Sequence, residues 1–267
     1  MDKEKVVKFW NDTSDSEWYN DYRTDEVING IIENPKSAFH HKAWERILDN
    51  ITNFKNKKIC VPSSGDNHAV FAFALLGAEV TSCDISERQI ENAKAIANRY
   101  NWEIEFVCDD TMSLSKIADN TYDFVYTSNG VHVWIDDLYA MYRSIFRILK
   151  NDGKYLMYEI HPFGRPFTYG NDVSDNKEIV VKKPYGDVGP HGLSYHWRIQ
   201  DFINAVVSNG LIVTHMEEMF AEYGTYWFES SGGRGHLSEK ELNELYDWKK
   251  NPLAGLPQWI CISADKR

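Results

Sequence analysis

The chain has 267 residues and a mass of 31.0 kDa, which fits one large domain or a domain with insertions. Its 29 Lys and Arg residues against 40 Asp and Glu residues give a net charge of −11, which disfavours nucleic acid and anionic membranes as partners. No apolar run approaches the roughly 20 residues of a transmembrane helix, and the start lacks the apolar region of a secretory signal, so we expect a soluble, cytoplasmic protein.

The first part of the chain is aromatic and helical in pattern, and we expect residues 1–54 to form a lid segment ahead of a core at 55–267. From about residue 57, short apolar runs alternate with longer stretches of helical period. That alternation is typical of βα units around a parallel sheet. The predicted strands cover residues 57–61, 79–83, 104–108, 122–127, 154–160, 211–219 and 258–264.

Helix boundaries carry recognisable signals. Ser86 precedes the second core helix and Gln89 follows three residues later, a spacing that predicts reciprocal capping of the helix start. The helix after the fourth strand is expected to end at Gly153. The first of these predictions fixes where a helix begins, and the second fixes where a helix ends.

Two insertions interrupt this regular alternation, at residues 161–196 and 221–257. The first is longer than the usual connection between a strand and a helix, as in lids and binding loops, and residues 178–189 in it suggest a hairpin. The second contains Ser238 and Glu241, which form another capping box for a helix that reaches about Trp248.

Polar residues follow the first strand, in the turn VPSSGDN at residues 61–67. In an open parallel sheet, ligands bind beyond the carboxyl ends of the strands. Gly65 allows close backbone approach, Ser63 and Ser64 offer hydroxyls, and Asn67 can cap the next helix. The turn therefore suits a polar ligand, although an ordinary strand-to-helix turn explains it equally well.

Aspartates follow the second and third strands. Asp84 lies nineteen positions after Gly65, where a carboxylate can accept hydrogen bonds from a ribose diol. Asp109 and Asp110 end the third strand, and one of them could accept from an adenine amine. Each aspartate alone could equally be a helix cap or a solvated loop residue, but polar groups at three successive strand ends favour a shared binding edge.

Taken together, residues 57–86, 106–114 and 122–157 resemble the class I S-adenosylmethionine-dependent methyltransferases, in particular those that act on small molecules. The resemblance covers about residues 55–220. It implies an α/β fold, with a Rossmann-like seven-stranded, mostly parallel sheet, an antiparallel last strand and helices on both faces. It also implies S-adenosylmethionine as cofactor and S-adenosylhomocysteine as product.

The resemblance assigns cofactor binding to residues at four strand ends. The loop is a variant one, because Val61 replaces the usual acidic residue, and Ser63 and Asn67 replace the first and third glycines. By this likeness Ser63, Ser64, Gly65 and Asn67 lie along the methionine and ribose, Asp84 and Ile85 at the ribose, Asp110 and Thr111 at the adenine, and Ser128 and Asn129 near the sulfonium.

Methyl transfer from a sulfonium is an in-line displacement that depends on positioning and requires no metal. A hydroxyl, thiol or protonated amine acceptor would need a base with a pKa near 7, which histidine supplies. His132 follows the fourth strand and His161 the fifth, so both are candidate catalytic residues. For His132 a structural role beside the cofactor is an equal alternative, and Glu159 is a weaker candidate base.

Aromatic residues outside the core indicate where the acceptor would bind. We name Tyr19 and Tyr22 in the lid segment, and Tyr226 and Trp227 in the late insertion, as candidate substrate-binding residues. An aromatic cap suits an apolar, ring-containing or cationic acceptor, although simple packing explains most aromatic clusters. We expect the acceptor site between the lid segment and the two insertions.

The sequence therefore predicts transfer of a methyl group from S-adenosylmethionine to an oxygen, nitrogen or sulfur atom of a small molecule. A non-catalytic binding or regulatory module on the same scaffold is an alternative. An NAD-dependent oxidoreductase is disfavoured, because the G-x-G-x-x-G fingerprint is absent from VPSSGDN. The four cysteines lack C-x-x-C spacing and are expected to be reduced and mostly buried.

Overall fold

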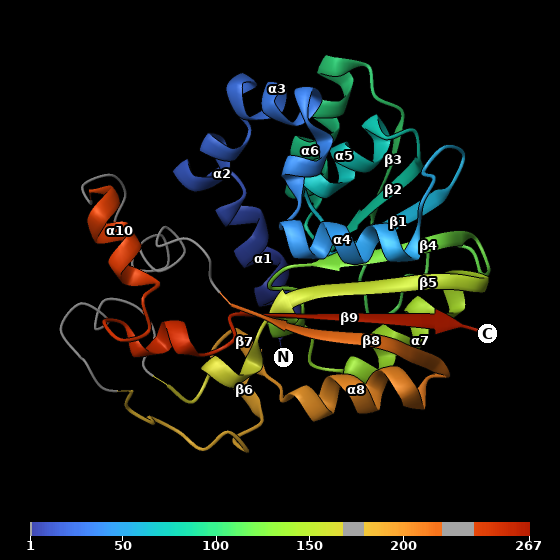
Figure 1. Ribbon diagram of the computed structural model, residues 1–267. Helices are drawn as coiled ribbons and strands as arrows, with labels where there is room; N and C mark the ends of the chain where they lie inside the picture. The colour runs from blue at the N-terminus through green and yellow to red at the C-terminus, as the bar shows by residue number, and fades with distance from the viewer. Residues whose placement is uncertain (1, 168–178, 221–237) are drawn as a thin grey trace.

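The computed structural model describes residues 2–167, 179–220 and 238–267. A seven-stranded sheet runs through the molecule in the order β3-β2-β1-β4-β5-β9-β8 (Figure 1). A separate pair of short strands, β6 and β7, forms a hairpin. The strands are β1 Lys58–Pro62, β2 Glu79–Asp84, β3 Ile104–Cys108, β4 Tyr122–Ser128, β5 Leu149–Ile160, β6 Gly189–His191, β7 Ser194–His196, β8 Leu211–Met219 and β9 Trp259–Lys266.

Strand directions follow the predicted fold. The strands β1 to β5 pair in parallel, whereas β9 is antiparallel to both β5 and β8. The carboxyl ends of β1 to β4 therefore meet at one edge of the sheet. The prediction of a Rossmann-like sheet with an antiparallel last strand is confirmed.

Helices cover both faces of the sheet, as Figure 1 shows. The helices α4, α5 and α6 pack one core against it, and α7 and α8 pack the other. The helices are α1 Lys3–Thr13, α2 Glu17–Tyr22, α3 Asp25–Glu33, α4 His41–Asn50, α5 His68–Leu75, α6 Glu87–Tyr100, α7 Leu138–Ile148, α8 Ile199–Ser208 and α10 Glu239–Leu245, with 3-10 turns at Pro35–Ala38, His132–Trp134, Pro162–Gly164 and Pro252–Gly255.

The α6 cap differs from its prediction in one respect. The Ser86 hydroxyl accepts from the Gln89 N–H at 3.1 Å, as expected. The Ser86 N–H, however, donates to the Asp84 carboxylate at 2.8 Å, while the Gln89 side chain accepts from Arg23. The Gln89 side chain therefore does not cap the Ser86 N–H. The capping box of α10, between Ser238 and Glu241, is complete.

Three boundaries require correction. The helix α7 ends at Ile148, before Gly153, because Leu149 already pairs with Tyr122 and begins β5. The hairpin in the first insertion lies at β6 and β7 and not at residues 178–189, since Gly192 supplies the left-handed turn between them. The helix α10 ends at Leu245, because the Asp247 side chain accepts the Lys249 N–H and starts a new turn.

Two further features of the described residues complete the fold. Of the helices in residues 2–167, 179–220 and 238–267, none is both long and apolar enough to cross a membrane. The four cysteines are free thiols; Cys60, Cys83 and Cys261 are buried, and Cys108 is half-buried. The predicted burial of most of the thiols is confirmed.

Candidate functional site

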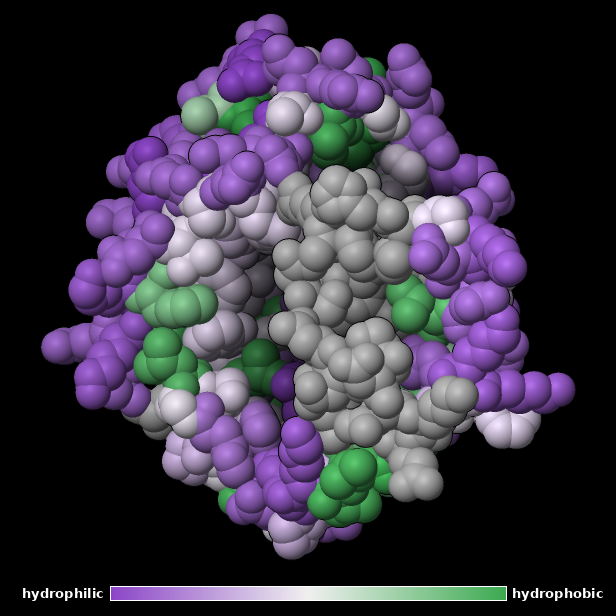
Figure 2. Space-filling view, turned by 90° about the vertical axis from the view of Figure 1, so that its left-hand side faces the viewer, coloured by the Kyte–Doolittle hydropathy of each residue, from purple (hydrophilic) through white to green (hydrophobic). Residues whose placement is uncertain are grey.

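A cavity of about 470 Å³ lies at the carboxyl ends of β1, β2, β3 and β4. Figure 2 looks onto this side of the molecule, where hydrophilic residues cover much of the outer surface and a narrow recess lies beside paler and hydrophobic residues. Ten of the lining residues, here called the polar wall, are those that the sequence assigned to a cofactor: Ser63, Ser64, Gly65, Asn67, Asp84, Ile85, Asp110, Thr111, Ser128 and Asn129.

The turn after β1 is held in a tight, left-handed form. Ser63 and Gly65 both have a φ of +49°, a conformation that favours glycine. The Ser64 N–H donates to the Cys83 carbonyl at 3.0 Å, which ties the turn to β2. A Cβ on Gly65 would lie 3.1–3.3 Å from the Gln89 side chain. The backbone of Gly65 is thus exposed to the cavity at a position that tolerates no side chain easily.

Asp84 ends β2 directly beside this turn, since Cys83 pairs with Pro62 of β1. Its carboxylate is buried and accepts from the Ser86 N–H at 2.8 Å. Burial raises the pKa of Asp84 to about 6, against the opposing effect of backbone bonds from Ser86 and Gly65. The carboxylate is ionised at neutral pH and lines the cavity as a hydrogen-bond acceptor.

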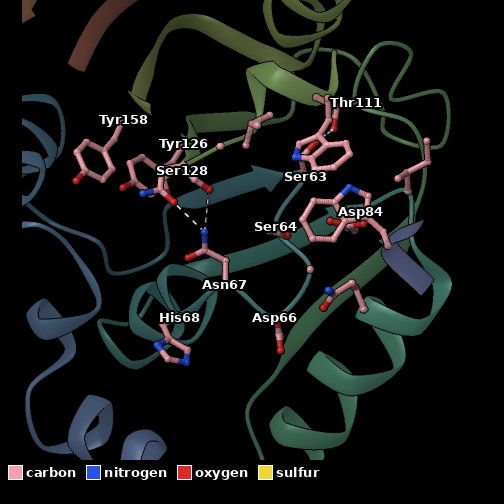
Figure 3. Close-up of a pocket in the computed structure, with 18 of the residues that line it drawn as sticks. Ser63, Ser64, Asp66, Asn67, His68, Asp84, Thr111, Tyr126, Ser128 and Tyr158 are labelled. Carbon is pink, nitrogen blue, oxygen red and sulfur yellow. Dashed lines mark hydrogen bonds between the residues drawn. The ribbon is translucent and has the colours of Figure 1, made fainter. Parts of the chain in front are cut away.

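The loops after β3 and β4 are linked to the β1 turn by side chains. The Thr111 and Ser63 hydroxyls lie 2.7 Å apart. The Asn67 amide donates to the Ser128 carbonyl at 3.0 Å and to its hydroxyl at 3.2 Å, the two dashed lines in Figure 3. Asn67 also caps α5 through its side-chain oxygen. These bonds connect three of the four strand ends of the polar wall into one frame.

Aromatic side chains form a second part of the lining, and the N-terminal segment supplies several of them. Trp18 stacks on Tyr22 with ring centroids 4.6 Å apart, and Tyr22 stacks on His68 at 4.7 Å. The predicted residues Tyr19 and Tyr22 both line the cavity, whereas Tyr226 and Trp227 lie outside the described residues. We call the following residues the aromatic wall: Trp10, Trp18, Tyr19, Tyr22, Phe39, Tyr126, Trp134, Tyr158 and Trp259.

His161 does not reach the cavity. Its ring is buried, with Nε2 2.9 Å from the Glu218 carboxylate of β8 and Nδ1 accepting from the Phe163 N–H at 3.1 Å. Burial lowers the pKa of His161. Both ring nitrogens are used inside the protein, so the predicted catalytic role is not supported. Within residues 161–167 and 179–196, no side chain of the first insertion lines the cavity.

His132 is also buried away from the cavity. Its ring lies between the Glu159 carboxylate and the Tyr142 hydroxyl, each at 2.8 Å. Glu159 further accepts from the N–H groups of Gly130 at 2.5 Å and of His132 at 3.0 Å. Burial favours a higher pKa for Glu159, but the contacts with His132 hold it below its ordinary value. The network supports the loop after β4 from beneath, which corrects the catalytic prediction for His132.

The structure brings in residues that sequence reasoning missed. Tyr126 shares the cavity face of β4 with Ser128, and Tyr158 is the β5 partner of Ser128 in register, so strand alternation was an available signal. His68 follows Asn67 directly; its Nε2 lies 2.9 Å from the Tyr22 carbonyl, to which it must donate. Burial lowers the pKa of His68. For His40, on the N-terminal segment, the sequence carried no signal.

Titratable groups at the cavity do not form a metal centre. In the part of the chain that the structure describes, no group of three or more His, Cys, Asp or Glu side chains is arranged to hold a metal ion. The side chains that line the cavity offer hydrogen bonding by carboxylates, amides and hydroxyls, together with contact to aromatic faces.

Comparison with known proteins gives the fold a family. Residues 62–157 match the family model of a methyltransferase domain. The sterol 24-C-methyltransferase erg6 of Aspergillus fumigatus is 29% identical over 144 residues, which are 53% of this chain and 36% of that protein. The chain thus spans about a third of the length of this relative. The resemblance to class I S-adenosylmethionine-dependent methyltransferases is confirmed.

Solved structures share the architecture. An S-adenosylmethionine-dependent methyltransferase from Mesorhizobium loti superposes with a TM-score of 0.62 at 16% identity, covering 83% of this chain and 96% of the other. The geranyl diphosphate C-methyltransferase of Streptomyces coelicolor, solved with Mg²⁺, geranyl diphosphate and S-adenosylhomocysteine, gives 0.60 at 12% identity, covering 99% and 98%. At these identities the likeness concerns the fold.

Proposed function

We propose that this chain, which carries a methyltransferase domain of the class I S-adenosylmethionine-dependent type, transfers a methyl group from S-adenosylmethionine to a small-molecule acceptor. The observation that carries the proposal is the polar wall. Ten residues from four strand ends, chosen on the sequence alone, line a single cavity. Because aromatic side chains supply a large part of the remaining lining, the cavity offers a polar place for the cofactor beside an apolar place for the acceptor.

The residues of the cavity fit the cofactor. The Gly65 backbone accommodates close approach of the methionine, together with Ser63, Ser64 and Asn67. Asp84, ionised above pH 6, accepts from the ribose hydroxyls, with Ile85 beside it. The loop after β3 meets the adenine, and the end of β4 meets the sulfonium, which supplies the methyl group. The residues of these two segments are Asp110, Thr111, Ser128 and Asn129.

The aromatic wall supports an apolar or ring-containing acceptor. Tyr158 stacks on His40 at 5.6 Å and packs against Trp259 at 5.3 Å, giving a broad apolar surface on the β5 side. Such a surface excludes water from the reacting atoms. An oxygen, nitrogen or sulfur nucleophile is the principal proposal. Carbon acceptors are the second, because the named relatives include a sterol and a geranyl diphosphate C-methyltransferase.

We further propose that residues 1–54 act as a lid over a core at residues 55–267. This division is supported because residues of α1, α2 and the 3-10 turn at Pro35–Ala38 line the cavity. The proposed partner is a small molecule in the cytoplasm. The net charge of −11 opposes a role for nucleic acid or an anionic membrane.

One experiment separates the candidate functions. Calorimetry measures binding of S-adenosylmethionine, S-adenosylhomocysteine and NAD, and a radiolabelled methyl assay tests a panel of phenols, thiols, amines, sterols and prenyl diphosphates. We expect micromolar or tighter binding of the first two ligands and methyl transfer to one acceptor class. Binding without transfer to any class favours the non-catalytic module. Binding of NAD alone contradicts the proposal.

A further inference from the structure

Residues 2–23 contact the residues around the cavity through two ion pairs of different kinds, Arg23 with Asp66 and Lys3 with Asp110. The Arg23 guanidinium pairs with Asp66 of the β1 turn and also donates to the Ser14 carbonyl at 2.5 Å and to Gln89 at 3.3 Å. The side chains of this pair are 12% and 8% exposed. Shielded from water and bonded several times, Arg23 holds the end of α2 firmly against the turn.

The start of α1 is held by a much weaker contact. The Lys3 ammonium lies 2.8 Å from Oδ2 of Asp110, and the Lys3 side chain is 59% exposed. Ion pairs with such an exposed partner contribute little to stability and weaken further in salt. The N-terminal segment is therefore firmly attached at α2 and loosely attached at the first turn of α1.

Lys3 contacts the Asp110 carboxylate oxygen that does not accept from the Met112 N–H. Asp110 has two carboxylate oxygens, and Oδ1 already accepts from the Met112 N–H at 2.9 Å. Oδ2 is thus the oxygen that remains for another donor, and Lys3 takes it. Under the proposed function, the same carboxylate accepts from the adenine amine. Both Lys3 and Asp110 line the cavity, so the two donors would meet at one atom.

We propose that Lys3 sets the cofactor affinity of this site by competing with the adenine amine for Oδ2 of Asp110. The inference rests on the proposed function, since it takes the cavity as the cofactor site. Cofactor binding then requires Lys3 to leave, and the first turn of α1 moves while the α2 end stays attached through Arg23. Through Lys3, the first turn of α1 would therefore change position when the adenine of the cofactor binds.

The test compares Lys3→Met with wild type by calorimetry, using S-adenosylhomocysteine as the probe. Lys5→Met is the matched control, because Lys5 lies on the same helix, carries the same charge and, among the described residues, pairs with Asp2 and not with a residue of the cavity. We expect Lys3→Met to bind about two- to fivefold more tightly at low salt. In about 0.5 M NaCl the difference should largely disappear, because screening removes the competing pair in wild type.

A second probe tests the atom itself. The analogue of S-adenosylhomocysteine in which a hydrogen atom replaces the adenine amine has no N–H at that position and cannot donate to Asp110. The advantage of Lys3→Met should be lost with this probe. Equal affinity of wild type and Lys3→Met for S-adenosylhomocysteine, or weaker binding by the variant, overturns the inference about Lys3 alone. Failure of both proteins to bind overturns the proposed function, and this inference with it.

Discussion

The polar wall and the aromatic wall of the cavity are built in different ways. Every residue of the polar wall belongs to the end of a parallel strand or to the loop that directly follows, so the register of the sheet brings them together. The aromatic wall gathers side chains from α1, α2, the segment before α4, the 3-10 turn at His132–Trp134, and strands β4, β5 and β9. Positions at strand ends follow from sheet topology, whereas for the segment outside the sheet the sequence indicated Tyr19 and Tyr22 but not the contacts that they make.

The largest effect should come from the backbone of the polar wall. Gly65→Val places a β-branched residue at a φ of +49° and its Cβ within 3.3 Å of Gln89. We expect S-adenosylhomocysteine affinity to fall at least about 100-fold in calorimetry. Gly186→Val is the control, since a Cβ there meets no atom within 4 Å. Unchanged affinity in a folded Gly65→Val protein would contradict the placement of the cofactor.

A substitution of Asp84 tests the contribution of a charged side chain of the polar wall. Asp84→Ala removes the proposed acceptor for the ribose hydroxyls and should weaken S-adenosylhomocysteine binding about 10- to 100-fold. The matched control is Glu87→Ala, which removes one negative charge at the exposed first residue of α6. A change of less than twofold in the Asp84 variant would count against the ribose assignment.

Titration of Asp84 should make binding pH-dependent. Its pKa is raised by burial to about 6, so the carboxylate gains a proton as the pH falls through 6. We expect S-adenosylhomocysteine affinity to fall by up to about tenfold per pH unit below that value in wild type. In Asp84→Asn this dependence should be absent. The raised pKa also means that the contribution of Asp84 to stability is present below pH 4 and lost as the pH rises through 6.

Substitutions in the aromatic wall should separate the two ligands. Tyr22→Ala removes a ring stacked between Trp18 and His68, and should reduce methyl transfer to an apolar acceptor about tenfold through lost contact area. Cofactor affinity should change less than about threefold. The control is Tyr139→Ala, at an exposed tyrosine of α7 that does not line the cavity. Equal losses for cofactor and acceptor would show that the two walls do not form separate subsites.

The smallest effect on binding is expected at His161. His161→Ala removes bonds to Glu218 and Phe163 without touching the cavity. The free energy of unfolding should drop by about 1–3 kcal/mol, while cofactor affinity stays within twofold. Thermal unfolding and calorimetry give both values. A large loss of cofactor affinity in His161→Ala would contradict the placement of His161 outside the site.

The difference between the polar wall, built from strand ends, and the aromatic wall also explains what the sequence could predict. Asp84 and Asp110 were found because a strand and a following helix fix where a strand end lies. His161 was misassigned because strand position places a side chain at the correct edge, but cannot reveal that Glu218, on a strand far along the chain, covers it. Tyr158 could have been found from its register with Ser128. The contact of Lys3 with Asp110 depends on the docking of α1, for which the sequence holds no register.

The position of β9 in the sheet has a consequence for the order in which the chain folds. Among the described strands, β8 pairs with β9 alone, and β9 joins it to β5. During synthesis, β8 therefore emerges before the strand that links it to the sheet. The unit of β1 to β5 can form from contacts made earlier in the chain, while β8 and the packing of α8 on it await the last strand. Until then the growing chain exposes the edge of β5, a surface on which a chaperone could act.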